Sequence, residues 1–363
     1  MNIVILSGHY YNSKKKAGFH FIADELSKDK DNKVVFISTA YNLKFIFSKK
    51  FLASDNRFKK NVFFNENENN LKSIINISIM TPTQKGNKYI QLLSILLYNL
   101  NIKAKREIKK ADYIIFESTY ALLFFEKIKR MNSKAKIIYR MSDDINALKY
   151  SKYIINYEKK IIKYFNYVSV PSKELLNRKI IYSKNNMEID FHGIDKSLFD
   201  QININPYKKD QKNLIFIGVA NLDVCFIDIA SSLFPYYYFH IIGQFKNRIK
   251  KTNVIYYGEM EYKKTIPYIQ FADIGLHTIE CFNDHAKTFS DSLKVIQYTY
   301  CKLPIIAPEI IEAKHRNNFI YYKYKDIESI RESINNAIRF DRNIIDKSTI
   351  ISWDTLARKL ISK

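Results

Sequence analysis

Short apolar runs alternate with helix-length segments along the whole chain. In the first half the runs are "IVILS" (3–7), "KVVFIS" (33–38), "INISIM" (75–80), "DYIIFE" (112–117), "KIIYR" (136–140), "YVSVPS" (167–172) and "MEIDFHG" (187–193). In the second half they are "NLIFIG" (213–218), "YYFHIIG" (237–243), "NVIYYG" (253–258), "ADIGLHT" (272–278) and "LPIIAP" (303–308). Most are almost continuously apolar, as parallel strands covered by helices on both faces should be. The pattern predicts two α/β domains, residues 1–193 and 194–349.

Two helical segments carry informative patterns. In "DSLKVIQYTY" (291–300) helical spacing places Lys294 and Gln297 on one stripe beside apolar residues. A solvated helix face is the ordinary explanation for such a pair. The segment "SWDTLARKLI" (352–361) is predicted to be an amphipathic helix introduced by the single tryptophan, Trp353.

In the second half the predicted elements follow one another in a distinctive order. Strands end in glycine at Gly218, Gly243 and Gly258, and a helix, a strand, a second helix and "LPIIAP" follow. This order resembles the glycosyltransferases with two Rossmann-like domains, the GT-B fold. The resemblance implies that the domains face a cleft, that the second binds a nucleotide sugar, and that residues 350–363 cross back to the acceptor-binding first domain.

Three stretches narrow the resemblance: "SGHYYNSKKKAGFHFIADEL" (7–26), "YRMSDD" (139–144) and "SLKVIQY" (292–298). They resemble the bacterial glucuronosyltransferase family typified by the xanthan-assembly 2-β-glucuronosyltransferase. The family implies an inverting transfer of glucuronic acid from a UDP-sugar to a lipid-linked or oligosaccharide acceptor in surface polysaccharide synthesis. A transferase that uses another sugar nucleotide, or a sugar-nucleotide epimerase, is the alternative.

Asp143 and Asp144 follow the "KIIYR" strand, and open α/β sheets bind ligands beyond the carboxyl ends of their strands. Inverting transfer needs a carboxylate that takes the proton of the acceptor hydroxyl. The resemblance assigns this role to Asp143, with Asp144 as the competitor. Alternatively the pair caps the next helix, since aspartate is a favoured N-cap.

The nucleotide site is expected at the start of the 291–300 helix. Ser290 and Asp291 would cap the helix, its first N–H groups would face an anion, and Lys294 would contact the phosphates. Gln297 would hold the ribose hydroxyls, and the family resemblance likewise implies nucleotide contacts at Lys294 and Gln297. Further residues assigned to this site are Gly218, Asn221, Ser292 and Leu293.

The loop "HYYNSKKKAGFH" is the candidate acceptor-binding loop, through His9, Lys16 and His20. Lys14, Lys15 and Lys16 could meet the pyrophosphate of a lipid-linked acceptor, or simply form a solvated basic loop. His20 either orients the acceptor or packs behind the loop.

The net charge is +23, and it is uneven: residues 1–200 carry 36 Lys or Arg and 19 Asp or Glu. Such a basic half favours an anionic partner, and we expect an anionic membrane surface contacted by the Lys14–Lys16 loop and by residues 89–110. A nucleic-acid partner is not expected, because no binding motif is recognisable.

No metal is expected, since no ligand pair with metal spacing occurs. There is no signal peptide pattern, and the longest nearly apolar run, 89–100, is too short to span a bilayer. Three widely spaced cysteines fit a reducing compartment. The sequence therefore predicts a cytoplasmic enzyme on the inner face of the membrane, without a cofactor other than its UDP-sugar substrate.

Overall fold

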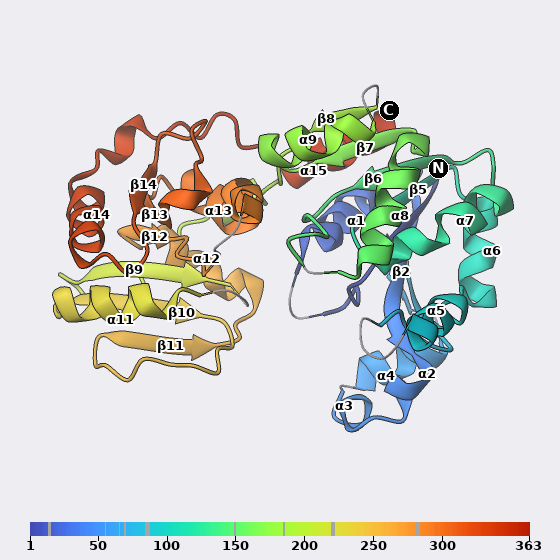
Figure 1. Ribbon diagram of the computed structural model, residues 1–363, viewed down its shortest axis with the longest axis horizontal. Coiled ribbons are helices and arrows are strands. Elements are labelled where there is room, and N and C mark those ends of the chain that lie inside the picture. The colour runs from blue at the N-terminus through green and yellow to red at the C-terminus, as the bar shows by residue number, and fades with distance from the viewer. Residues whose placement is uncertain are drawn as a thin grey trace. The chain divides into compact units, whose positions relative to one another are not determined.

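The computed structural model describes residues 1–13, 16–54, 56–64, 66–68, 70–83, 88–148, 150–183, 186–218, 222–280 and 284–363, the side chains of 284–285 excepted. The chain divides into two compact units (Figure 1). The first unit consists of Met1–Asp190 and Trp353–Lys363, and the second of Phe191–Ser352. Each unit is an α/β structure built on its own sheet, so the predicted fold class is confirmed.

The first unit contains an eight-stranded sheet in the order β3-β4-β2-β1-β5-β6-β7-β8. Its pairs are parallel except for the antiparallel pair of β3 and β4. The strands are β1 (Asn2–Ser7), β2 (Lys33–Asn42), β3 (Glu66–Glu68), β4 (Leu71–Ser78), β5 (Tyr113–Glu117), β6 (Lys136–Arg140), β7 (Tyr167–Val170) and β8 (Met187–Ile189). Residues 3–7 of β1 are buried, as the apolar run predicted for a central strand.

Helices cover both faces of this sheet (Figure 1). They are α1 (Gly18–Lys28), α2 (Leu43–Ile46), α3 (Lys49–Leu52), α4 (Asn56–Phe63), α5 (Lys88–Leu96), α6 (Ile102–Lys110), α7 (Phe125–Met131), α8 (Lys152–Ile161), α9 (Lys173–Lys179) and the C-terminal α15 (Trp353–Ser362). The buried Trp353 ring of α15 stacks on Phe21 of α1, with centroids 5.1 Å apart. Lys359 pairs with Asp190 at 2.5 Å. The C-terminal helix therefore returns to the first unit, as predicted.

The second unit is a six-stranded parallel sheet in the order β11-β10-β9-β12-β13-β14. The strands are β9 (Lys212–Ile217), β10 (Tyr237–Ile242), β11 (Val254–Gly258), β12 (Ile274–Leu276), β13 (Ile305–Pro308) and β14 (Phe319–Tyr322). The helices are α10 (Lys196–Phe199), α11 (Val224–Leu233), α12 (Tyr262–Gln270), α13 (Leu293–Tyr300) and α14 (Ile327–Arg339).

Glycine is required at the end of β10. Gly243 has φ +141°, and a Cβ there would lie 1.8 Å from the carbonyl oxygen of Gly218, which follows the neighbouring strand β9. Only glycine allows the two strand ends to approach this closely. Close backbone packing thus explains the glycine after β10, whereas Gly258 at the end of β11 has open space around it and a positive φ of +72°.

Candidate active site

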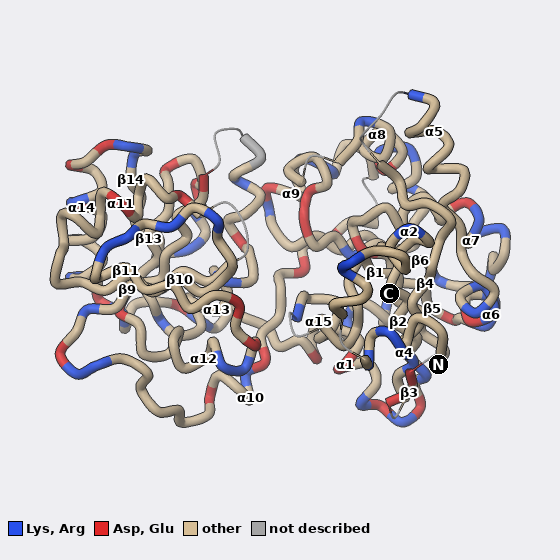
Figure 2. Tube along the Cα trace, turned by 90° about the horizontal axis from the view of Figure 1, so that it is seen from below, with Lys and Arg blue, Asp and Glu red and all other residues tan. Residues whose placement is uncertain are grey.

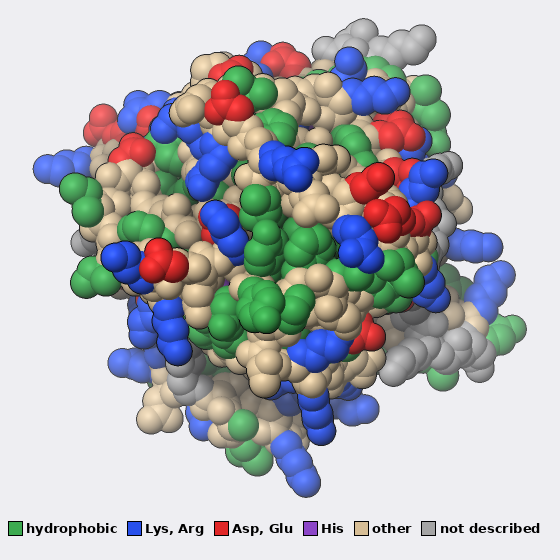
Figure 3. Space-filling model, turned by 90° about the vertical axis from the view of Figure 1, so that its left-hand side faces the viewer, with side chains coloured by type: hydrophobic (Ala, Val, Ile, Leu, Met, Phe, Trp, Pro, Cys, Tyr) green, Lys and Arg blue, Asp and Glu red, His purple; other side chains and the backbone are tan. Residues whose placement is uncertain are grey.

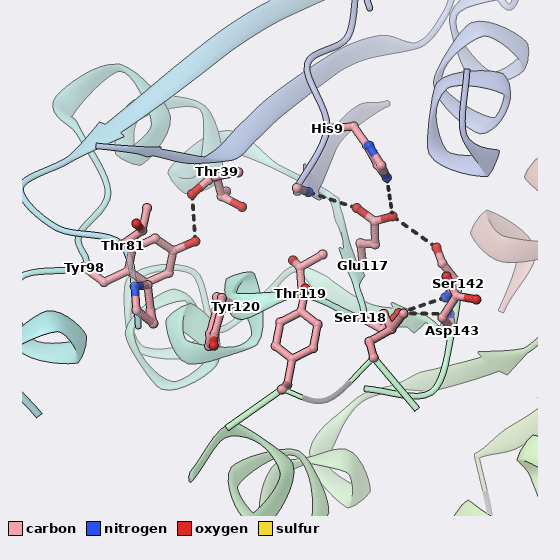
Figure 4. A pocket seen from close by; sticks show the side chains of 15 residues that line it. His9, Thr39, Thr81, Tyr98, Glu117, Ser118, Thr119, Tyr120, Ser142 and Asp143 are labelled. Atoms are coloured by element: carbon pink, nitrogen blue, oxygen red, sulfur yellow. Dashed lines mark hydrogen bonds and ion pairs between the residues drawn. The ribbon is translucent and has the colours of Figure 1, made fainter. Parts of the chain in front are cut away.

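A pocket of about 440 Å³ opens at the carboxyl edge of the first sheet (Figure 4). Residues that follow or end β1, β2, β5 and β6 line it, as expected for ligand sites of open α/β sheets. The lining residues used below are Gly8, His9, Thr39, Glu117, Tyr120, Asp143 and Tyr150.

Glu117, the last residue of β5, connects three loops at the pocket wall. Its carboxylate accepts hydrogen bonds from the Ser7 hydroxyl (2.6 Å), the Gly8 N–H (2.9 Å) and the Ser142 hydroxyl (3.1 Å). Burial raises its pKa, but hydrogen bonds and the charge of His9 outweigh burial, so the pKa is lowered. Glu117 is therefore a buried carboxylate that stays ionised. The sequence analysis did not identify it, although an acid at the end of a predicted strand was a visible signal.

Asp143 lies exposed in the pocket wall beside these groups (Figure 4). The hydroxyl of Ser118 accepts hydrogen bonds from the N–H groups of Ser142 and Asp143, at 3.0 and 3.2 Å, and so fixes the loop. Although the residue is solvent-accessible, the protein that walls the pocket keeps part of the water away from its carboxyl group. This desolvation, followed by the charge of Glu117, raises the pKa of Asp143 to about 6. The structure thus presents this carboxylate to the pocket.

His9 completes the cluster. Its Nε2 lies 3.5 Å from the carboxylate of Glu117, and half of its side chain is exposed. Burial lowers the pKa of His9, but Glu117 and then Asp143 outweigh this and raise the pKa above its ordinary value. Asp143, Glu117 and His9 together form a compact set of titratable groups in one pocket.

Asp144 has a different environment from its neighbour. It is buried, and it pairs with Lys179 of α9 at 3.2 Å. One carboxylate oxygen also accepts hydrogen bonds from the backbone and side chain of Asn146, both 3.0 Å long. Burial raises the pKa of Asp144, but Lys179 and Asn146 outweigh it and lower the pKa. Asp144 does not line the pocket, and its contacts are those of a structural ion pair.

The opposite wall of the pocket carries aromatic rings and hydroxyl groups. The rings of Tyr120 and Tyr150 lie with centroids 4.8 Å apart, and the Tyr98 hydroxyl donates to the Thr39 carbonyl at 2.9 Å. Flat rings beside hydroxyl groups suit a ligand that has both apolar faces and many hydroxyls.

His20 does not reach the pocket. It is completely buried; Nδ1 accepts from the Ala17 N–H at 2.9 Å, and Nε2 lies 2.8 Å from the Tyr10 carbonyl. Burial lowers its pKa to about 4. The expectation that His20 contacts the acceptor is therefore corrected. Its ring packs behind the loop of residues 9–20 and hydrogen-bonds to the backbone of Tyr10 and Ala17.

Lys16 also contacts side chains of its own unit rather than the pocket. Its Nζ lies 5.0 Å from the centroid of the Tyr11 ring and 3.9 Å from Asp24. Lys14 and Lys15 lie outside the described residues. The structure therefore brings only His9, of the three predicted acceptor residues, into the pocket.

In the second unit, α13 begins at Leu293, slightly later than expected. Its N-cap is Ser292, and Asp291 instead pairs with Arg316 at 2.5 Å and His315 at 2.9 Å. The predicted capping by Ser290 and Asp291 is therefore wrong, since the buried Asp291 carboxylate instead contacts Arg316 and His315 of another loop. The Ser292 hydroxyl is buried and has no hydrogen-bond partner among the described residues.

Lys294 lies at the start of α13, next to the end of β9. Its Nζ lies 4.0 Å from the centroid of the Phe216 ring and 3.7 Å from where a Cβ on Gly218 would stand. No acidic side chain in the described part of the chain pairs with it, and burial lowers its pKa to about 7. His277 is buried and lies near Lys294. Burial, followed by the charge of Lys294, lowers the pKa of His277. An unpaired ammonium at a helix N-terminus is an arrangement suited to an anion.

Gln297 and the remaining predicted nucleotide residues are less exposed to a ligand. Gln297 is buried, and its side chain contacts the Tyr262 hydroxyl. Leu293 is partly buried, and Asn221 lies outside the described residues. The nucleotide roles of these residues stay predictions. Among the described residues no group of three or more His, Cys, Asp or Glu is arranged to hold a metal ion.

Comparisons with known proteins agree with this picture. Residues 5–171 match the family model described as the glucuronosyltransferase GumK, N-terminal domain. The UDP-glucuronate:glycolipid 2-beta-glucuronosyltransferase of Xanthomonas campestris pv. campestris is 28% identical over 255 residues, which is 69% of this chain and 62% of that protein.

Two solved structures share the fold across the chain. Anabaena Alr3699/HepE in complex with UDP and glucose has a TM-score of 0.69 at 12% identity, covering 99% of this chain and 98% of that one. The UDP-forming alpha,alpha-trehalose-phosphate synthase of Burkholderia xenovorans, in complex with glucose-6-phosphate, has a TM-score of 0.59 at 10% identity, covering 99% and 100%. The chain therefore has the GT-B fold, and the match of residues 5–171 to the GumK N-terminal domain confirms the resemblance inferred from the sequence.

Proposed function

We propose that the protein is a glycosyltransferase that moves a sugar from a UDP-sugar to an acceptor hydroxyl with inversion, and that Asp143 is the general base. One observation carries this proposal: of two adjacent aspartates, only Asp143 presents its carboxylate to the pocket at the carboxyl edge of the sheet. Asp144 is held by Lys179.

The proposed step is a single displacement. Asp143 takes the proton of the acceptor hydroxyl while that oxygen bonds to the anomeric carbon, and the bond from this carbon to the UDP oxygen breaks on the opposite face. A pKa of about 6 leaves Asp143 ionised at neutral pH and more basic than an ordinary aspartate. Glu117 supports the base by fixing the Ser142 side chain next to it.

The donor is proposed to bind the second unit. Lys294 and the N–H groups at the start of α13 would meet the charge that develops on the diphosphate, without a metal, and Gln297 would hold the ribose. The solved relatives named above include one with UDP bound, and the Xanthomonas relative is named for UDP-glucuronate. We therefore propose UDP-glucuronate as the donor.

The acceptor is proposed to be a lipid-linked oligosaccharide at the inner face of the membrane, in surface polysaccharide synthesis. The Xanthomonas relative is named for a glycolipid acceptor, and the aromatic wall of the pocket suits a sugar. The strongly positive first 200 residues, with 36 Lys or Arg and 19 Asp or Glu, suit an anionic surface. Figure 3, which draws the side of the second unit, shows Lys and Arg side chains there interspersed with Asp and Glu.

The test compares Asp143→Asn with Asp144→Asn. With UDP-glucuronate and a glycolipid acceptor, Asp143→Asn should lose about 10²-fold or more in transfer while UDP affinity stays unchanged, the scale for removal of a general base. Asp144→Asn should lower stability but keep transfer per folded molecule. Full activity of Asp143→Asn would contradict the mechanism, and conversion of the UDP-sugar without any acceptor would indicate an epimerase.

A further inference from the structure

Asp291 lies directly before α13 but does not cap this helix. The helix begins at Leu293 with Ser292 as its N-cap, and the N-cap side chain makes no capping hydrogen bond. Aspartate is among the favoured capping residues, and the partial positive charge of a helix N-terminus attracts a carboxylate. The surroundings of the Asp291 carboxylate must therefore explain why it lies elsewhere.

Two cations from the loop before β14 hold this carboxylate. The Asp291 side chain is fully buried, and its Oδ1 accepts hydrogen bonds from Nε and Nη2 of Arg316, at 2.9 and 2.5 Å. Nε2 of His315 lies 2.9 Å from the same oxygen, and the Ser290 hydroxyl donates to Oδ2 at 3.1 Å. Burial raises the pKa of Asp291, but His315 and Arg316 outweigh burial and lower it. The carboxylate therefore stays ionised in this position.

The ring of Phe191 packs against both cations. It stacks on the His315 ring with centroids 6.1 Å apart and an interplanar angle of 11°. The guanidinium carbon of Arg316 lies 5.7 Å from the centroid of the Phe191 ring, and the Arg316 side chain is only 5% exposed. All of these residues belong to the second unit. Arg316 is therefore a fixed, buried partner of Asp291 and not a mobile surface cation.

The first turn of α13 keeps groups that attract an anion. Among the described residues the buried hydroxyl of Ser292 has no hydrogen-bond partner, and Lys294 has no acidic partner. Asp291, if it were not held, would be drawn to the same groups, because its carboxylate could pair with Lys294 and accept from the first N–H groups. Figure 2 shows Lys and Arg positions among Asp and Glu positions throughout the second unit, so local packing decides which cation a carboxylate contacts.

We infer that Arg316 is a positioning residue for the proposed donor site, because it holds Asp291 away from the first turn of α13. Without Arg316 the Asp291 carboxylate would occupy the place proposed for the diphosphate and compete with it as an internal anion. His315 supports the same arrangement with a second contact. The inference rests on the proposed function only for the identity of the bound anion.

The first test measures the affinity of the full chain for UDP and for uridine by calorimetry. Arg316→Gln should weaken UDP binding by about fivefold or more, the scale of one capping interaction. Its affinity for uridine, which has no diphosphate, should change by less than about twofold. Asp291→Ala should bind UDP at least as tightly as wild type, and the double variant Arg316→Gln, Asp291→Ala should regain wild-type affinity. A double variant as weak as Arg316→Gln, or equal losses for UDP and uridine, would overturn the inference.

Hydrogen exchange of the nucleotide-free chain tests the same inference independently of the donor. In Arg316→Gln the N–H groups of residues 293–295 should gain the Asp291 carboxylate as acceptor and exchange more slowly, and adding Asp291→Ala should remove this effect. If Arg316 served stability alone, losing a buried ion pair would speed their exchange instead. Faster exchange in Arg316→Gln would therefore refute the positioning role. If wild type binds no uridine nucleotide, the proposed donor is wrong, and the exchange result still decides the role of Arg316.

Arg342 offers a matched control at the other end of α13. Its guanidinium donates to the carbonyl groups of Lys302 and Cys301, at 2.7 and 3.1 Å, just after the last turn. Arg342→Gln should lower stability but keep the wild-type ratio of UDP to uridine affinity, because it releases no carboxylate. An equal change of this ratio in Arg342→Gln and Arg316→Gln would contradict the inference.

A milder variant covers the case in which Arg316→Gln does not fold. His315→Ala removes one contact of Asp291 from a partly exposed side chain and keeps Arg316. It should weaken UDP binding by about twofold or more, and adding Asp291→Ala should restore the affinity. A loss that Asp291→Ala leaves in place would again count against the inference.

Discussion

At the scale of single residues, two neighbouring carboxylates in the first unit have opposite surroundings. Asp143 faces a pocket together with Glu117 and His9, and Asp144 is neutralised by a buried lysine. A general base must reach its substrate and hold a proton well enough to remove it, whereas Asp144 lies outside the pocket and its pKa is lowered by Lys179 and Asn146. The environment rather than the residue type therefore distinguishes the proposed base.

The first prediction concerns pH. Because Asp143 acts as a base only when ionised, kcat/KM should fall as the pH drops through about 6. The positive charge of His9 lowers the pKa of Asp143, so His9→Gln should raise that pKa and move the acidic limb to higher pH. A pH–rate profile of both proteins checks this. A limb that stays in place, or moves to lower pH, would show that His9 does not act on the base.

The second prediction concerns Lys294. Lys294→Ala should weaken UDP binding by about 1.5–3 kcal/mol, the range for a hydrogen bond to a charged group. Burial lowers the pKa of Lys294 to about 7, so the ammonium is fully present below that pH and is lost above it in the free protein. The difference in affinity between wild type and Lys294→Ala should therefore be largest below pH 7 and shrink above it. Gln297→Ala, which removes a neutral group, should cost less. Equal affinities at all pH values would mean that Lys294 does not contact the diphosphate.

Site residues were predictable only where a motif marked them. Asp143, Lys294 and His9 lie in stretches that resemble a known family. The residues alone could not show which of Asp143 and Asp144 faces the pocket, since both follow the same strand. Their difference depends on Lys179, which is distant in sequence and pairs with Asp144. Glu117 and the buried position of His20 depend on contacts with loops distant in sequence.

At the scale of elements, helices α8 and α9 support the loop that carries Asp143, the proposed base. Lys179 of α9 lies between Asp144 and Glu158 of α8, at 3.2 and 2.6 Å, and the Tyr139 hydroxyl donates to Glu158 at 2.6 Å. All four side chains are buried. This polar chain joins β6, α8, α9 and the loop after β6 inside the core.

Lys179→Met should accordingly lower the free energy of unfolding by about 3–5 kcal/mol, because it leaves two buried carboxylates without their cation. Urea unfolding followed by fluorescence checks this. Lys160→Met changes an exposed lysine on α8 and serves as the control, with little effect expected. If the two variants unfold alike, the buried chain contributes little to the stability of the loop.

Elements with long apolar runs were predictable, and short polar ones were not. The "KIIYR" strand coincides with β6, whereas β3, with sequence "ENE", lacks any apolar signal because it is an edge strand. The helical segment α2 to α4 was also missed. Its helices are short. The hydroxyl of Ser48 and the side-chain carbonyl of Asn42 cap α3 and α2 by accepting hydrogen bonds from the N–H groups of Phe51 and Phe45.

At the scale of the whole molecule, the fold follows from the order of its elements. Two parallel sheets with separate cores, and a last helix that packs on the first unit through Trp353, repeat the arrangement expected from the sequence. The order of strands and helices could be predicted because each buried strand is a continuous apolar run between helix-length segments. The sequence alone could not show that apolar side chains of α5, such as Tyr89 and Leu96, are exposed.

The most direct test of the account is a calorimetric titration of the full chain with nucleotide sugars. The account predicts that UDP and UDP-sugars bind, that UDP-glucuronate binds more tightly than UDP-glucose, and that GDP-mannose and ADP-glucose do not compete. Asp143→Asn should bind UDP-glucuronate as wild type does, because the base contacts the acceptor. Absence of binding by every uridine nucleotide, or a preference for another base, would contradict the proposed function.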